Sequence, residues 1–125
     1  MKTVLFVSSN KILGQGLSAA ILSKPEFDFR WEAQLQYSQA IVGADVFHAD
    51  VVLLDVADQV DMKRALEICQ SLRQNSQTTK ILLLVRPEQA AVRAQAVDAK
   101  NAGQVDNFVF YDSSLSYLLA KLAAL

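Results

Sequence analysis

The chain has 125 residues, of which 52% are hydrophobic and 20% are charged, and its formal net charge is -1. This size and balance describe one globular domain spanning residues 1–125, and they exclude a disordered or fibrous protein. The 12 lysines and arginines are scattered, which argues against direct nucleic-acid binding because phosphate recognition needs a basic face.

The first half of the chain alternates between β-like and helical patterns. We predict a strand at 3–7, a helix at 12–24, a strand at 29–35, a short helix at 38–46 and a strand at 51–55. Asn10 is suited to cap the first helix, and Pro25 ends it. The run from Val51 to Leu54 is entirely aliphatic, as expected of a strand covered on both faces.

The second half continues the alternation. We predict a helix at 60–74, a strand at 81–85, a helix at 87–102 with Pro87 in its first turn, a strand at 107–111 and a final helix containing Leu118, Leu119 and Leu122. Gly103 is suited to end the fourth helix. Asp58 is a candidate cap for the helix near Val60, and the segment 112–114 supplies caps for the last helix.

Strands that alternate with helices form a parallel sheet through right-handed crossovers. The fold class is therefore α/β, a doubly wound, flavodoxin-like (βα)5 sheet with strand order 2-1-3-4-5. In that order the first and third strands are neighbours. The loops after Val7, Val85 and Tyr111 then share one sheet edge with Asp55, the edge at which ligands bind in such sheets.

Three groups of residues resemble the receiver domains of two-component response regulators. They are Val7-Ser8-Ser9-Asn10 with Ile12-Leu13 and Gly16-Leu17, the run Ala49-Asp50-Val51-Val52-Leu53-Leu54-Asp55-Val56, and Ala102-Gly103 with Asp106-Asn107-Phe108. The resemblance covers the whole chain, with one extra residue near Gln104. It implies that Asp55 stands at the position of the phosphoacceptor aspartate.

The other positions of the receiver pocket depart from the family's pattern. The acidic pair that holds Mg²⁺ falls on Ser8 and Ser9, which are poor magnesium ligands. The Thr or Ser position falls on Val85, followed by Arg86, and the Lys position falls on Tyr111. The resemblance therefore implies a degenerate pocket with no metal and no cofactor, in which little remains to neutralise the charge of phosphoryl transfer.

Each pocket residue has two interpretations. Asp55 is a residual acceptor, or a polar strand end that bonds to Ser8, Ser9 or backbone N–H groups. Arg86 holds an anion above the sheet, or is solvated. Tyr111 is a fixed form of the family's switching aromatic, or a plain strand-end residue.

A narrower resemblance concerns the second half of the chain. Lys80-Ile81-Leu82-Leu83-Leu84, Pro87-Glu88 and Val109-Phe110-Tyr111 are similar to the N-terminal receiver-like domain of LuxR-type biofilm regulators such as CsgD. Those degenerate receivers precede a helix-turn-helix, which would begin after Leu125 if this chain is the receiver portion of a longer regulator. It supports no second-messenger site within this span.

The cellular setting follows from simple features. No stretch is long and apolar enough to cross a membrane, and no signal peptide opens the chain. The lone Cys69 has the pattern of a buried helix residue in a reducing compartment. We therefore expect a cytoplasmic protein.

Three hypotheses for function remain open. The first is a non-enzymatic pseudo-receiver that binds protein partners in signalling or transcription control, with a homodimer through the face formed by the fourth helix, fifth strand and fifth helix. The alanine-rich helix at 87–102 is either part of such a docking face or alanine-rich simply because alanine is the best helix former. The second is a receiver phosphorylated at Asp55 by a histidine kinase. The third is a nucleotide- or flavin-binding protein in which Ser8-Ser9-Asn10 cradles a phosphate.

Overall fold

The computed structural model describes residues 1–76 and 78–125, in which strands and helices alternate. The strands are β1 (Lys2–Val7), β2 (Phe29–Gln34), β3 (Val51–Val56), β4 (Lys80–Val85) and β5 (Asn107–Phe110). The α-helices are α1 (Lys11–Leu22), α2 (Ala40–Val46), α3 (Gln59–Asn75), α4 (Ala90–Asn101) and α5 (Leu115–Ala124), and a 3-10 turn, η1 (Tyr37–Gln39), precedes α2.

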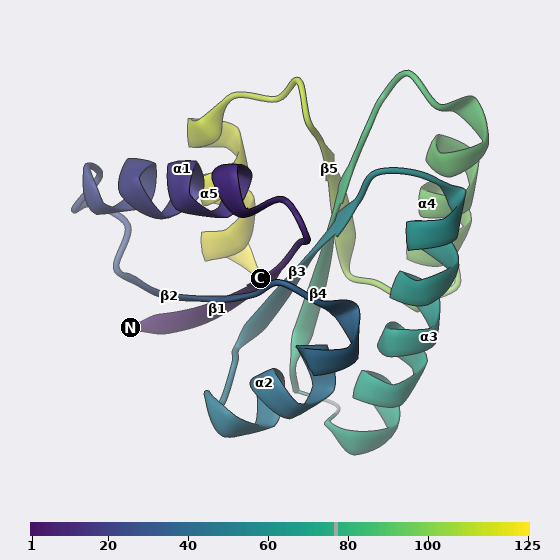
Figure 1. The fold of residues 1–125 in the computed structure, drawn as a ribbon, viewed down its shortest axis with the longest axis horizontal. Coiled ribbons are helices and arrows are strands. Elements are labelled where there is room, and N and C mark those ends of the chain that lie inside the picture. The colour runs from purple at the N-terminus through teal and green to yellow at the C-terminus, as the bar shows by residue number, and fades with distance from the viewer. Residues whose placement is uncertain (77) are drawn as a thin grey trace.

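All strand pairs are parallel, and the sheet order β2-β1-β3-β4-β5 confirms the predicted topology. Helices α1 and α5 cover one face, and α2, α3 and α4 cover the other (Figure 1). Val7 at the end of β1 is aligned with Leu54 of β3. The loops after β1 and β3 therefore meet where the strand order reverses.

The core lies on both faces of the central strands. Every residue of β3 is buried, which agrees with its uninterrupted aliphatic pattern. Full burial of a side chain such as Leu53 contributes about 1.5–3 kcal/mol. On the α1 and α5 side, Trp31 packs on the sheet face against Phe6, with a ring-centroid separation of 5.5 Å.

Side-chain caps begin three of the helices. The Asn10 carboxamide accepts the Leu13 N–H at 3.0 Å, and Asp58 accepts the Asp61 N–H at 2.9 Å. At α5 the cap is Ser114, which accepts the Tyr117 N–H at 3.1 Å. The neighbouring Asp112 and Ser113 of the predicted cap segment lie outside the helix.

Three predicted boundaries are wrong by a few residues. Pro87 does not start α4, because residues 86–89 form a turn whose Pro87 carbonyl accepts the Arg93 guanidinium, and the helix begins at Ala90. The segment 38–46 is not one helix but a 3-10 turn followed by α2. β5 ends at Phe110 rather than at residue 111. Gly103 does end α4, in the left-handed region with φ of 76°.

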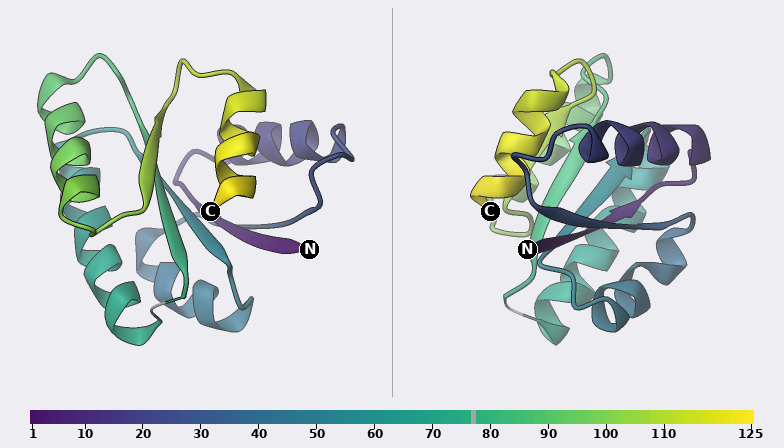
Figure 2. Two further views of the ribbon diagram at one scale, coloured as in Figure 1. Left: turned by 180° about the vertical axis from the view of Figure 1, so that it is seen from behind. Right: turned by 90° about the vertical axis from the view of Figure 1, so that its left-hand side faces the viewer.

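The two ends of the described chain are joined by one side chain. The Lys2 ammonium donates to the carbonyls of Leu122, Ala123 and Leu125 at 3.1, 2.9 and 2.5 Å. It thereby satisfies the last carbonyls of α5, where a positive charge is favoured by the helix dipole. The start of β1 and the end of α5 lie close together as a result (Figure 2).

Cys69 is a free, fully buried thiol on α3, and burial raises its pKa to about 12, which keeps it protonated and unreactive. Among residues 1–76 and 78–125, the longest apolar helical stretches fall short of what a membrane span requires.

Candidate functional site

Asp55 lies on β3 at the edge where the strands end, between β1 and β4, and is only 7% exposed. The Ser8 hydroxyl donates to its Oδ2 at 2.5 Å and accepts the Asn10 N–H at 3.0 Å. The other carboxylate oxygen, Oδ1, is buried and has no hydrogen-bond partner in the described part of the chain. The loop after β1 is thus tied to Asp55 through Ser8, and Ser9 is exposed.

The environment of Asp55 disfavours its charged form. Burial raises the pKa of its carboxyl group above the ordinary 3.8, and the nearby Asp61 raises it further. The Ser8 hydrogen bond and the Arg86 charge act in the opposite direction. The carboxylate therefore has one donor and one distant cation to stabilise its charge.

Arg86 and Tyr111 stack on each other above this edge. The Arg86 guanidinium carbon lies 5.1 Å from the centroid of the Tyr111 ring, a cation–π arrangement. The Tyr111 N–H donates to the Val85 carbonyl at 3.0 Å, which holds the tyrosine at the end of β5. Both the Arg86 Nε and the Tyr111 hydroxyl are buried without a partner in residues 1–76 and 78–125. Val85 is fully buried and presents no hydroxyl.

Tyr37 is a site residue that the sequence reasoning missed. It lies in η1, directly after β2, and its hydroxyl donates to the backbone carbonyl of Asp55. Burial, then the charges of Asp61 and Asp55, raise the pKa of the phenol, so it remains a donor at all ordinary pH values. Its position in the sequence could have identified it, because it closely follows the second strand and that strand ends at the same sheet edge as Asp55.

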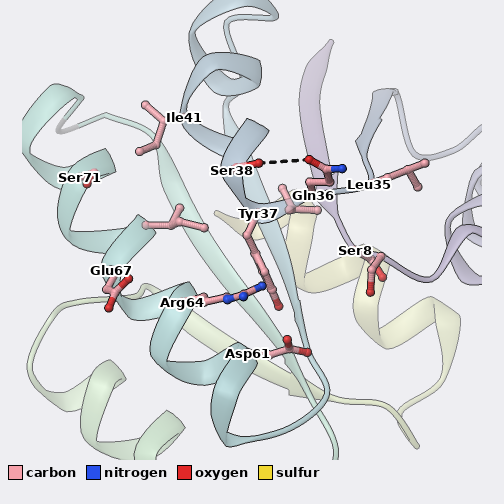
Figure 3. Close-up of a pocket in the computed structure, with 13 residues that line it drawn as sticks. Ser8, Leu35, Gln36, Tyr37, Ser38, Ile41, Asp61, Arg64, Glu67 and Ser71 are labelled. Atoms are coloured by element: carbon pink, nitrogen blue, oxygen red, sulfur yellow. Dashed lines mark hydrogen bonds between the residues drawn. The ribbon is translucent and has the colours of Figure 1, made fainter.

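An open groove of about 660 Å³ runs beside Tyr37, between the loops after β1 and β2 and helix α3 (Figure 3). Arg64 and Asp61 of α3 lie beside Tyr37 in it, and Ser8 also lines it (Figure 3). Asp55 does not line this groove, but its two hydrogen-bond partners, Ser8 and Tyr37, do. The groove is therefore linked to Asp55 through these two residues.

The residues present do not fit a magnesium site. Mg²⁺ takes six oxygen ligands in octahedral geometry, among them one or two carboxylates and several waters. The loop after β1 adds no carboxylate beside Asp55, because it offers only the neutral Ser8 and Ser9. Across the described residues, no three His, Cys, Asp or Glu side chains are grouped to hold a metal ion. Within the described part of the chain, the free Asp55 Oδ1 can accept a hydrogen bond, but the residues around it lack the oxygen ligands that a hard cation requires.

Replacing Asp55 with asparagine should stabilise the protein at neutral pH. Because the folded pKa of Asp55 lies above 3.8, its contribution to stability falls as the pH rises from 3.8 through that folded value. Asn keeps an acceptor for Ser8 without a charge, so Asp55→Asn should raise the free energy of unfolding by about 1 kcal/mol at pH 7. The gain should shrink toward pH 4, as measured by urea unfolding.

The control for this prediction is Asp98→Asn, which removes one negative charge from the exposed surface of α4. A gain from Asp55→Asn that is the same at every pH, or that Asp98→Asn reproduces, would contradict the assignment of the effect to the buried carboxylate.

Comparison with solved structures identifies the fold. No family model and no curated protein sequence matches the chain. Among solved structures, the chain is similar to the receiver domain of the Francisella response regulator 1452, with 14% identity, TM-score 0.77 and coverage of 99% of this chain and 95% of that one. The chemotaxis protein CheY4 of Vibrio cholerae matches with 21% identity, TM-score 0.76 and coverage of 99% and 98%.

A third similar structure is the response regulator protein TrrA of Thermotoga maritima, solved in complex with Mg²⁺ and BeF, with 18% identity, TM-score 0.76 and coverage of 99% and 98%. At these identities the likeness establishes the fold, which is that of response-regulator receiver domains over the full length of the chain.

Proposed function

We propose that this chain is a receiver-type module of signal transduction that acts by binding proteins, is not an enzyme, and does not use Mg²⁺-dependent phosphorylation of Asp55. The observation that carries the proposal is the 2.5 Å hydrogen bond from Ser8 to Asp55 Oδ2. It places a neutral hydroxyl where the resemblance to receivers expects a metal-binding carboxylate.

The remaining pocket residues support the same proposal. Phosphoryl transfer is catalysed mainly by positioning and by neutralising the charge on the phosphoryl oxygens. Val85 has no hydroxyl, and Arg86, whose charge acts on Asp55, is stacked on Tyr111. Nothing in this group of residues is arranged to receive a phosphoryl group on Asp55, so the pocket favours one fixed state over a switch.

For the partner-binding surface we propose the face formed by α4, β5 and α5, including a homodimer through it. A groove of about 510 Å³ lies on this face, and Phe108 and Phe110 are among the residues that line it. Tyr117 is 48% exposed there, and the Lys121 ammonium lies 5.4 Å from its ring centroid. Exposed aromatic rings beside cations suit a protein partner. The resemblance to LuxR-type regulators makes transcription control in the cytoplasm the proposed setting.

The proposal is tested by incubating the protein with Mg²⁺ and acetyl phosphate and then measuring its mass. We expect no gain of a phosphoryl group, and no thermal shift on adding Mg²⁺ with beryllofluoride. TrrA, whose structure holds Mg²⁺ and BeF, is the positive control. A stoichiometric gain that disappears in Asp55→Asn would overturn the proposal in favour of a receiver phosphorylated at Asp55.

A further inference from the structure

Strand β2 leaves one of its edges open. It is the first strand in the sheet order and, among the described residues, pairs only with β1. The Lys2 N–H donates to the Asp28 backbone carbonyl at 3.2 Å, and the Ser8 N–H donates to the Gln34 backbone carbonyl at 3.0 Å. Since backbone groups alternate in direction along a strand, even-numbered residues of β2 face β1, and the backbone groups of Trp31 and Ala33 face outward.

The side chains of β2 are self-complementary about its middle residue. Arg30 and Glu32 flank Trp31 and lie on one face of the strand, where they form an ion pair at 3.2 Å. An antiparallel copy centred on Trp31 would exchange both backbone hydrogen bonds between the two Trp31 residues. Arg30 of each copy would then lie opposite Glu32 of the other, in the non-hydrogen-bonded position that brings side chains closest.

Other registers fit less well. Centring the pair on Phe29 would use an N–H that already donates to the Phe27 carbonyl at 3.1 Å. Centring it on Ala33 would place Glu32 opposite Gln34 and leave both arginines without an acidic partner. In the register centred on Trp31, the Phe29 carbonyl remains available to accept the Ala33 N–H of the second copy.

We propose that the open edge of β2 is a self-association surface at which a second copy of this chain adds in antiparallel register, held by two reciprocal Arg30–Glu32 ion pairs. The pairing is isologous, so it closes after two copies and covers the edge that would otherwise recruit further strands. The edge lies on the opposite side of the sheet from β5. It therefore leaves the α4, β5 and α5 face free for another partner, and it does not depend on the function proposed above.

Charge reversal and charge exchange test the pairing by sedimentation velocity over a dilution series. Either Arg30→Glu or Glu32→Arg places like charges opposite each other twice in the dimer, and should raise the dissociation constant at least about tenfold. The double variant Arg30→Glu with Glu32→Arg restores both ion pairs and should restore the native dimer. Circular dichroism confirms that each variant is folded.

A backbone variant gives an independent test. Ala33→Pro removes an N–H on the open edge while leaving the side that faces β1 intact, so it should abolish the dimer without changing any charge. Lys63→Glu reverses a charge on the exposed surface of α3, outside β2 and outside the α4, β5 and α5 face, and should leave this dimer unchanged. A native chain that is monomeric throughout the series, or a charge-exchange variant that stays monomeric, would overturn the proposal.

Discussion

The combined variant Ser8→Asp, Ser9→Asp, Val85→Thr and Tyr111→Lys should take up one phosphoryl group on Asp55, whereas the native chain should take up none. The two aspartates supply the oxygen ligands that Mg²⁺ requires beside Asp55. The threonine and lysine supply a hydroxyl and a cation for the phosphoryl oxygens, as in the receivers that the chain resembles. We expect stoichiometric uptake from acetyl phosphate with Mg²⁺, measured as a mass increase and abolished by chelation.

Two controls keep this result interpretable. The same variant with Asp55→Asn should gain no mass, and the variant without Ser8→Asp and Ser9→Asp should remain inert because it lacks the metal ligands. If the combined variant is folded and binds Mg²⁺ yet takes up no phosphoryl group, the missing residues do not account for the loss of phosphorylation. In that case a feature that the variant shares with the native chain, such as the burial of Asp55, prevents phosphorylation.

Replacing Tyr37 with alanine should lower the free energy of unfolding by about 3 kcal/mol. The substitution removes a half-buried ring from between η1 and α3, and it leaves the Asp55 carbonyl without the donor that it has in the native protein. Because that carbonyl belongs to a wholly buried strand, the lost hydrogen bond adds to the cost of the lost ring. Urea unfolding with a constant m-value measures the change.

The conservative variant Tyr37→Phe separates the two contributions, since it keeps the ring and removes only the hydroxyl; it should cost about 1 kcal/mol. Tyr117→Ala is the matched control at an exposed tyrosine and should change stability by less than about 0.5 kcal/mol. Equal effects of Tyr37→Ala and Tyr117→Ala would show that Tyr37 does not hold the Asp55 loop in place.

The fold was predictable from the sequence because its signals are local and consistent. The aliphatic run ending at Asp55 predicts a buried strand, and Asn10 predicts the start of a helix; both are seen in the structure. Alternation of strands and helices then restricts the topology, and the strand order follows. The ends of individual helices and strands were harder to predict. Pro87 is compatible with a first helical turn, but in the structure it lies in a turn before α4. The Pro87 carbonyl of that turn accepts the Arg93 guanidinium, and the Gln89 side chain donates to the Ala57 carbonyl at 2.8 Å.

The arrangement within the candidate site was less predictable, because it depends on contacts between distant segments. The location of Asp55 and Ser8 at a shared edge follows from strand order, and their hydrogen bond was one of the alternatives foreseen. The stacking of Arg86 on Tyr111 joins the ends of β4 and β5, and no sequence pattern indicated this contact. Tyr37 carries no motif, so only the folded chain reveals its bond to Asp55.

The hydrogen bonds of the Lys2 side chain hold the two ends of the chain close together. Its ammonium contacts the carbonyls at the end of α5, so the first strand begins within one side-chain length of Leu125. A short flexible linker from Leu125 to Met1 should therefore permit a circular permutant, with new ends opened in the exposed turn at Gly103 and Gln104. In such a permutant β5 and α5 would come first in the chain and α4 last, while the sheet order remained unchanged.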